Sequence, residues 1–235
     1  VQKGKGGGLS SAFGGGMYWY GDGADISVTD SAFRTNTAEH GAGLYWSDGA
    51  PTISDCVIQG NTATGWAVTT TTEVVDEDDP TSVTTTSEST YDGGTGGGLY
   101  CLSSDALIQN CYIFQNTCTG DGGGIYFVEG RPILKNCLLT GNTAFIGGGG
   151  IASHWEAAPT ITNCTIVANE ASDPNDSTRG YGGGLFCSYE SQTILVNSIL
   201  WNNDGRFGNQ IAIGSKDDPT YLQRPAGLTV RFSDV

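Results

Sequence analysis

The stretch GGGIYFVEGRPILKNCLLTGN, residues Gly122–Asn142, contains every feature that the rest of the chain repeats. Three glycines precede a short apolar run, an acidic turn and a second apolar run that leads to Asn-Cys and then to a further Asn. The first apolar residue after each glycine run serves as an anchor for alignment. The anchors are Met17, Leu44, Leu99, Ile125, Ile151, Leu185 and, without glycines before it, Ile211. Their spacings are 27, 55, 26, 26, 34 and 26 residues, which indicates a repeat of about 26 residues interrupted by insertions.

Two polar positions recur in each repeat. A Cys or Ser lies 12 to 14 residues after each anchor, and an Asn always follows it by five residues. The Asn residues are Asn36, Asn61, Asn116, Asn142, Asn169 and Asn203. The residue directly before the Cys or Ser is Asn or Asp, which suits a left-handed corner where stacked amides bond along the axis. We therefore predict structural ladders of Asn110, Asn136, Asn163 and Asn197 and of Cys56, Cys111, Cys137 and Cys164.

The repeat unit predicts an all-β fold. Each unit holds about three short apolar runs between Gly, Asn and Asp, and no segment has the pattern of a long amphipathic helix. Glycine makes up 37 of 235 residues, but it is clustered before strands and not placed at every third residue, which excludes collagen. We predict one solenoid over residues 1–235, a parallel β-helix of seven to eight coils with three short strands each.

Three insertions interrupt the repeat, at residues 66–95, 170–181 and 214–227. In the first, two β-branched arms flank the acidic turn Asp76–Pro80, which favours a projecting hairpin over a disordered Thr-rich loop. The first two insertions follow the recurring Asn, so we expect them at one edge of the rod, and the third at a different corner. The chain opens and closes within a motif, without an obvious cap. We therefore expect a segment of a longer chain or a unit that assembles through its ends.

The glycine-aliphatic and apolar-x-x-Asn motifs resemble right-handed parallel β-helix repeats of the pectin-lyase-like superfold. They are also similar to repeats of chlamydial polymorphic outer-membrane proteins, which pair a glycine-rich motif with Phe-x-x-Asn, as in Phe33–Asn36 here. The final stretch, Asn197–Val235, resembles the last coils of large secreted β-helix proteins of planctomycetes. The resemblance implies a fold that carries lyases, hydrolases, adhesins and passive stalks, and so it does not by itself imply one function.

Composition limits the functional classes. The net charge of −15 disfavours nucleic acid as a partner and fits an extracellular or cell-surface location in bacteria, with divalent cations as potential ligands. No run of 18 apolar residues occurs, so no membrane span is expected. The cysteines are interpreted as an inward stack of thiols, with disulfides between coils as the alternative, and no Cys/His metal spacing is present. Cys118 lies alone in a turn and is expected to be the free or intermolecular thiol.

Two outward columns are candidate binding sites. The residue after each anchor is usually aromatic: Tyr18, Tyr45, Tyr100, Tyr126 and Phe186, with Ala152 as an interruption. These rings are expected to stack along the sheet, to form a packing face between rods or to bind sugars. An acidic residue follows each anchor strand: Asp22, Asp48, Asp105, Glu129, Glu156 and Glu190. These carboxylates are candidate calcium ligands, and the alternative is a solvated turn.

Catalytic residues are not identified. The polygalacturonase-like patterns Asn-Thr-Asp, Gly-His-Gly and Arg-Ile-Lys are missing, and His40 and His154 lie in distant repeats at expected turns. We leave open whether the protein is an enzyme, although the sequence favours a protein without catalytic activity. We expect that it requires no cofactor. We expect an extracellular structural or adhesive protein that assembles with itself into a fibre, sheath or stalk, or that binds a surface glycan. The alternative is a lyase or glycosidase that binds or degrades polysaccharide.

Overall fold

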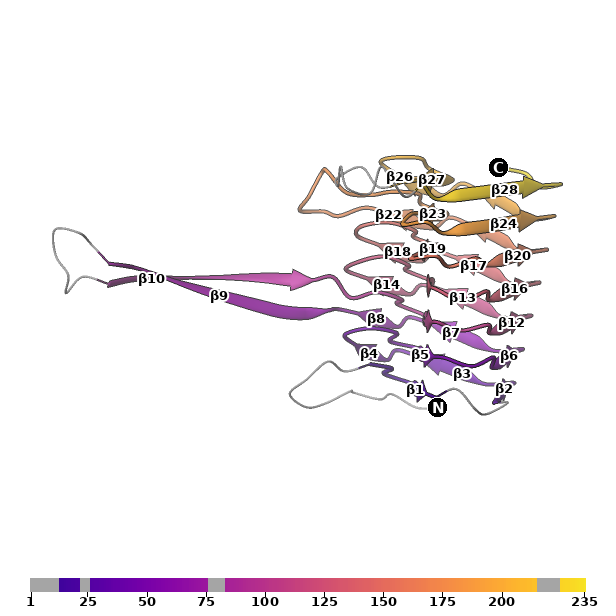
Figure 1. Cartoon of the computed structure of the whole chain (residues 1–235), viewed down its shortest axis with the longest axis horizontal. Helices are drawn as coiled ribbons and strands as arrows, with labels where there is room; N and C mark the ends of the chain where they lie inside the picture. Colours follow the sequence, from indigo (N-terminus) through magenta and orange to yellow (C-terminus); the bar gives the residue numbers. More distant parts are fainter. Residues whose placement is uncertain (1–12, 22–25, 76–82, 215–224) are drawn as a thin grey trace.

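The computed structural model describes residues 13–21, 26–75, 83–214 and 225–235, and these residues form strands and no helix. The strands build a solenoid with four parallel sheets along its length and one antiparallel hairpin that projects from its side (Figure 1). The first sheet has seven strands, so the described part of the solenoid has seven coils. The all-β parallel solenoid predicted from the repeat is confirmed.

Each coil passes through the four sheets in turn. The anchor sheet consists of β1 (Met17–Tyr20), β5 (Leu44–Ser47), β11 (Leu99–Leu102), β15 (Ile125–Val128), β19 (Ile151–His154), β23 (Leu185–Cys187) and β27 (Ile211–Ile213). The second sheet consists of β2 (Ser27–Thr29), β6 (Thr52–Ser54), β12 (Leu107–Gln109), β16 (Ile133–Lys135), β20 (Thr160–Thr162), β24 (Gln192–Val196) and β28 (Gly227–Arg231).

The other two sheets have six strands each. The third sheet consists of β3 (Ala32–Arg34), β7 (Val57–Gln59), β13 (Tyr112–Phe114), β17 (Leu138–Thr140), β21 (Thr165–Val167) and β25 (Ile199–Trp201). The fourth sheet consists of the two-residue strands β4 (Thr37–Ala38), β8 (Thr62–Ala63), β14 (Thr117–Cys118), β18 (Thr143–Ala144), β22 (Glu170–Ala171) and β26 (Asp204–Gly205). The sequence predicted three strands per coil because these pairs contain no large apolar residue.

The core is a stack of equivalent side chains. In one coil, Leu99, Ile108 and Ile113 come from three different sheets and are all fully buried. Their counterparts in the next coil pair with them in register, as Leu99 does with Ile125. Each fully buried Leu or Ile contributes about 1.5–3 kcal/mol relative to exposure. The repeat of about 26 residues therefore stacks equivalent apolar side chains of successive coils into one continuous core.

The glycine run forms the tightest corner of each coil. Gly122 has a φ of 74°, in the left-handed region that glycine adopts without steric penalty. Gly124 has a different restriction, because a Cβ atom there would lie 2.5 Å from the carbonyl oxygen of Gly150 in the next coil. The glycine triplet thus combines one conformational requirement with close backbone contact between coils.

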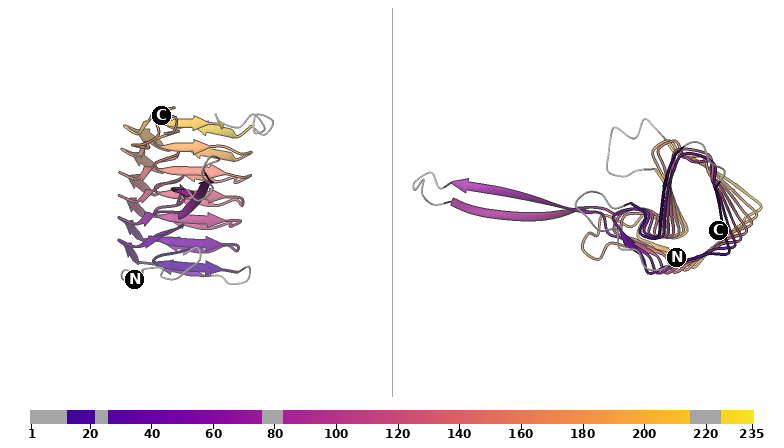
Figure 2. Two further views of the ribbon diagram at one scale, coloured as in Figure 1. Left: turned by 90° about the vertical axis from the view of Figure 1, so that its left-hand side faces the viewer. Right: turned by 90° about the horizontal axis from the view of Figure 1, so that it is seen from below.

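The insertion at residues 66–95 contains a hairpin. Strand β9 (Trp66–Val75) pairs antiparallel with β10 (Val83–Asp92) along ten residues, from Trp66–Asp92 to Val75–Val83. It leaves the solenoid just after β8, and the second insertion follows β22 (Figures 1 and 2). Since β8 and β22 belong to the fourth sheet, both insertions lie at one edge of the rod. The third insertion begins after β27, and its residues 215–224 lie outside the described part of the chain.

Candidate functional site

A row of asparagines runs through the interior along the axis. Its members are Asn36, Asn61, Asn116, Asn142, Asn169 and Asn203, all buried. Each Asn donates two hydrogen bonds, one from its backbone N–H and one from its side-chain amide, to the Oδ1 atom of the Asn in the next coil. Asn142, for example, donates to Asn169 over 3.0 and 2.9 Å, and its amide also donates to the Ile113 carbonyl over 3.0 Å. The row ends on Gln210, whose Oε1 accepts from Asn203 over 2.7 Å. We call this the buried amide row.

A second row lies on the surface at the corner between the second and third sheets. Its bonds run from Asn197 to Asn163, Asn136 and Asn110 over 2.7, 3.2 and 3.2 Å, and then to Asp55 over 3.1 Å. These residues are exposed and have φ values between 48° and 56°. The structure therefore places the four predicted asparagines at left-handed corners in one bonded row, which we call the exposed amide row.

The cysteines lie inside the solenoid. All seven are free and buried, and Cys56, Cys111, Cys137 and Cys164 form the predicted column between the two amide rows. Each of these four donates to the carbonyl two residues earlier, as Cys137 does to Lys135 over 3.3 Å. Cys118 is free, as expected, but it lies in β14 and not alone in a turn, and it packs fully buried among small residues that include Ala63 and Ala144, so it is not available for an intermolecular disulfide. Burial raises the pKa of its thiol well above the usual value, and so it offers no accessible thiolate.

The aromatic column stacks but is mostly covered. Ring centroids are 5.3 Å apart for Tyr18–Tyr45, 4.8 Å for Tyr45–Tyr100 and 5.1 Å for Tyr100–Tyr126. Tyr45, Tyr126 and Phe186 are buried, whereas Tyr18 is 50% exposed. Burial raises the pKa of Tyr45 to about 12, with the Tyr18 and Asp48 charges acting in the same direction. The rings therefore stack along the sheet, with Tyr18 as the most exposed of them, and sugar binding by this column stays a prediction.

The rings of the aromatic column are covered by residues that precede the glycine runs and by one histidine. Phe13 packs on Tyr45 with centroids 4.7 Å apart, and Tyr181 stacks on Phe186 at 5.3 Å. His154 occupies the space left by the small side chain of Ala152, with its Nδ1 3.2 Å from the Tyr126 hydroxyl. Burial lowers the pKa of His154 to about 3, which keeps the ring neutral. The expected turn position of His154 is wrong, because His154 is the last residue of β19, two residues after Ala152.

The acidic positions do not converge. Asp48, Glu129, Glu156 and Glu190 occupy left-handed turn positions in four coils, and Ser103 holds this position in the coil between those of Asp48 and Glu129. The carboxylate of Asp48 accepts from Ser47, that of Glu129 from Ser103 and that of Asp105 from the Arg131 backbone. Among the described residues no group of three or more Asp, Glu, His or Cys side chains is arranged to hold a metal ion. Asp22 lies outside the described residues. Calcium binding stays a prediction.

A polar pocket of about 280 Å³ lies beneath the second insertion, at the edge that carries the hairpin. Arg179 forms ion pairs of 3.1 Å with both Asp173 and Asp176, which fold the loop over the pocket. Arg206 and Asp204 line the opposite side, and the Arg206 guanidinium lies 5.9 Å from the centre of the Phe207 ring. The pocket thus offers hydroxyl, carboxylate and guanidinium groups beside an aromatic ring.

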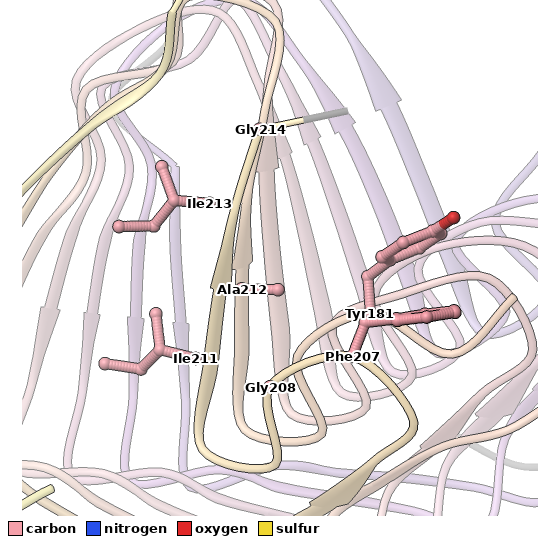
Figure 3. A pocket seen from close by; sticks show the side chains of 7 residues that line it. All are labelled: Tyr181, Phe207, Gly208, Ile211, Ala212, Ile213 and Gly214. Carbon is pink, nitrogen blue, oxygen red and sulfur yellow. The ribbon is translucent and has the colours of Figure 1, made fainter. Parts of the chain in front are cut away.

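A second cavity, of about 370 Å³, lies at the last strand of the anchor sheet (Figure 3). It is lined by Tyr181, Phe207, Gly208, Ile211, Ala212, Ile213 and Gly214. Figure 3 shows Ala212 on the same side of β27 as the Tyr181 and Phe207 rings, while Ile211 and Ile213 point to the other side. This mainly apolar cavity is the end pocket.

The stacked parallel sheets and amide rows define the class as a β-helix solenoid. Residues 15–223 match the family model for the right-handed β-helix region, and the chain belongs to this family. No curated protein and no solved structure gives a significant match. The narrower similarity to polymorphic outer-membrane proteins stays a prediction. In the part of the chain that the structure describes, no helix has the length and apolarity to cross a membrane.

Proposed function

We propose that this protein is an extracellular structural or adhesive β-helix, in which a rigid solenoid holds the β9–β10 hairpin toward another surface. The observation that supports this role is the isolation of the hairpin. Its two strands form a sheet of their own and join none of the four solenoid sheets (Figure 1). Ten residues at about 3.3 Å each give the ribbon a reach of about 33 Å from the rod.

The physical properties of such a ribbon favour binding. An isolated two-stranded hairpin is marginally stable in water, so a partner that completes the sheet stabilises it. Both outer edges carry unpaired backbone groups that accept an added strand. Ten of the twenty strand residues are Thr or Ser, so the sequence of the ribbon is rich in hydroxyl groups. The solenoid supplies the rigid base because its coils are bonded in register.

Deletion of residues 66–94 tests the proposal. The deletion removes 29 residues and reduces the spacing between Leu44 and Leu99 from 55 to 26, the basic repeat. We expect beads coated with the intact protein to adhere to bacterial cells or to members of a panel of immobilised glycans and matrix proteins. We expect beads coated with the deletion variant to lose at least nine-tenths of that adhesion while its circular dichroism and melting remain those of a solenoid.

Deletion of residues 173–179 is the matched control. It removes the other insertion at the same edge and leaves two residues between Ala171 and Tyr181, as there are between Cys118 and Asp121. This control should adhere like the intact protein. Equal adhesion by the hairpin deletion, or no adhesion of the intact protein to any surface, would overturn the proposed role of the hairpin.

Polysaccharide binding is the second candidate function, and the polar pocket beneath residues 172–180 favours it. Guanidinium and carboxylate groups there could bind the hydroxyl and acid groups of a sugar, with Phe207 beside them. The Arg206→Ala variant should then lose glycan binding while the hairpin deletion keeps it. The two variants therefore separate the two candidate functions in one panel.

A further inference from the structure

Four of the seven thiols lie on successive coils without interruption, and we call them the thiol column. Its members Cys56, Cys111, Cys137 and Cys164 directly precede β7, β13, β17 and β21, which are neighbours in the third sheet. The residues after these cysteines pair in register, as Tyr112 does with Val57 on one side and Leu138 on the other. Neighbouring strands lie about 4.8 Å apart, so each thiol has another thiol one strand spacing away.

The other three cysteines have different neighbours. Cys101 pairs in register with Trp46 and Phe127, Cys118 with Ala63 and Ala144, and Cys187 with Ser153 and Ile213. Adjacent thiols are therefore a property of the thiol column, and the chain itself supplies buried thiols without a thiol neighbour for comparison.

The sulfur atoms of the thiol column point the same way. Each Sγ lies 3.1–3.3 Å from the carbonyl oxygen two residues earlier in its own coil. Each also lies 3.5–3.8 Å from a carbonyl oxygen of the preceding coil, as Cys137 does from that of Ile108. Because the surroundings repeat from coil to coil, adjacent sulfur atoms lie about one strand spacing apart, on the order of 4.8 Å.

This spacing fits a metal ion that takes two sulfur ligands. A zinc–thiolate bond is about 2.3 Å long, and a linear sulfur–metal–sulfur unit with bonds of that length spans about 4.6 Å. Soft thiolates select soft ions such as Cu(I), which accepts two ligands in line. Structural zinc sites use four ligands. Within the part of the chain that the structure describes, no three Cys, His, Asp or Glu side chains are grouped to hold a metal ion. The thiol column therefore favours Cu(I) over zinc.

Backbone N–H groups point along the thiol column. The N–H of Cys111 donates to Sγ of Cys137 over 3.4 Å, and that of Cys164 donates to Oγ of Ser198 over 3.0 Å. A hydrogen bond to the charged form of a group stabilises that form. Such donors therefore stabilise negative charge on sulfur once a metal ion has replaced the thiol proton.

The thiol column also lies close to the surface. Its members are only 1–3% exposed, but the residue before each of them is exposed at the corner that carries the exposed amide row, as Asn136 is before Cys137. An ion therefore has to pass one corner residue to reach the sulfur atoms.

We propose that the thiol column binds two Cu(I) ions, one between Cys56 and Cys111 and one between Cys137 and Cys164. Each ion forms two metal–sulfur bonds, and the two thiols release their protons to water without any change of oxidation state. The bridge carries one negative charge, which N–H donors such as that of Cys111 stabilise. This site lies inside the rod, so it goes beyond the adhesive role proposed for the hairpin and does not depend on it.

A double variant that separates the thiols tests the site. Cys111→Ser/Cys164→Ser leaves no two adjacent thiols in the thiol column, and Ser is already native to this column at Ser198, opposite Cys164. Cu(I) is titrated without oxygen into the reduced proteins in competition with a chromophoric Cu(I) chelator, and Ag(I) serves as a second probe that is not oxidised by air. We expect two ions per chain in the parent protein. The double variant should bind Cu(I) more weakly by about 100-fold or more.

Cys118→Ala/Cys187→Ser is the matched control, because it also keeps five cysteines but leaves the thiol column intact. Ala144 and Ser153 are the native in-register neighbours of the two changed positions, so the replacements suit the core. This control should bind two ions like the parent. Equal affinity of the two double variants, or failure of the parent to take Cu(I) from the chelator, would overturn the inference.

A single variant keeps the test decisive if the first double variant does not fold, which circular dichroism monitors. Cys137→Ser retains the adjacent pair of Cys56 and Cys111 and leaves Cys164 alone. It should bind one ion per chain, whereas two ions per chain would contradict the proposed pairs.

Discussion

The buried and the exposed amide rows use the same side chain, once per coil and only six residues apart, as at Asn136 and Asn142. Their bonds have similar lengths, yet their surroundings differ. Asn142 is completely buried, and both its backbone N–H and its side-chain amide donate to the next Asn of its row. Asn136 is exposed, and only its side-chain amide donates to the next Asn of its row, while its backbone N–H donates to the Thr162 carbonyl. Water can replace the bonds of the exposed row but cannot reach those of the buried row. The same chemistry should therefore contribute very different free energies of folding.

The largest effect is expected for Asn142→Ala. The change removes the acceptor for the backbone and amide groups of Asn116 and the donor to the Ile113 carbonyl. Buried polar groups left without a partner cost about 1–3 kcal/mol each, so we expect a loss of about 3–5 kcal/mol in unfolding free energy. Urea unfolding followed by circular dichroism measures it. A loss below about 1 kcal/mol would show that the buried row is not a major source of stability.

A buried polar group outside either row sharpens the comparison. One carboxyl oxygen of Asp121 is buried without a hydrogen bond, and burial raises the pKa of this group to about 7, with Arg179 opposing the shift. The pKa of Asp in the unfolded chain is about 3.9. Between about pH 4 and 7 the Asp121 carboxyl group is therefore protonated in the folded state and ionised in the unfolded state. The free energy of unfolding should therefore fall as the pH rises from about 4 to 7, and it should stay at the lower value above pH 7.

Asp121→Asn cannot ionise and should escape that loss. We expect the variant to be more stable than the parent at pH 8, by on the order of 2–4 kcal/mol, with the advantage shrinking toward pH 4. Thermal and urea unfolding at both pH values test this. An advantage of equal size at both would show that the carboxyl group is not the cause.

The smallest effect is expected in the exposed row. Asn136→Ala should lose about 1 kcal/mol, mainly because Ala is strained at a left-handed corner. Asn136 has a φ of 54°, a conformation that glycine adopts freely, so Asn136→Gly should change stability by only about 0.5 kcal/mol or less. The same urea experiment measures both variants. If Asn136→Gly were as damaging as Asn142→Ala, the contrast between the rows would be wrong.

Much of the architecture was predictable because the repeat carries it. The anchors and the Asn and Cys columns recur at nearly constant spacings, and each corresponds to a position in the coil, whereas the hairpin arms stand out because they interrupt that spacing. The fourth sheet was missed because Thr-Ala pairs give no hydrophobic signal. The rings that follow the anchors stack in one column, but their exposure was not predictable from alternation, since it depends on what else packs against the sheet.

The sequence by itself determined the period, the direction of the anchor side chains and the edge where two insertions leave the rod, because these follow from spacing within one coil. Tertiary structure alone decided which positions meet water. Residues before the glycine runs cover Tyr45 and Phe186, His154 fills the space at Ala152, and Cys118 is enclosed by small side chains of neighbouring coils. Burial is a property of contacts between coils, and no single repeat contains that information.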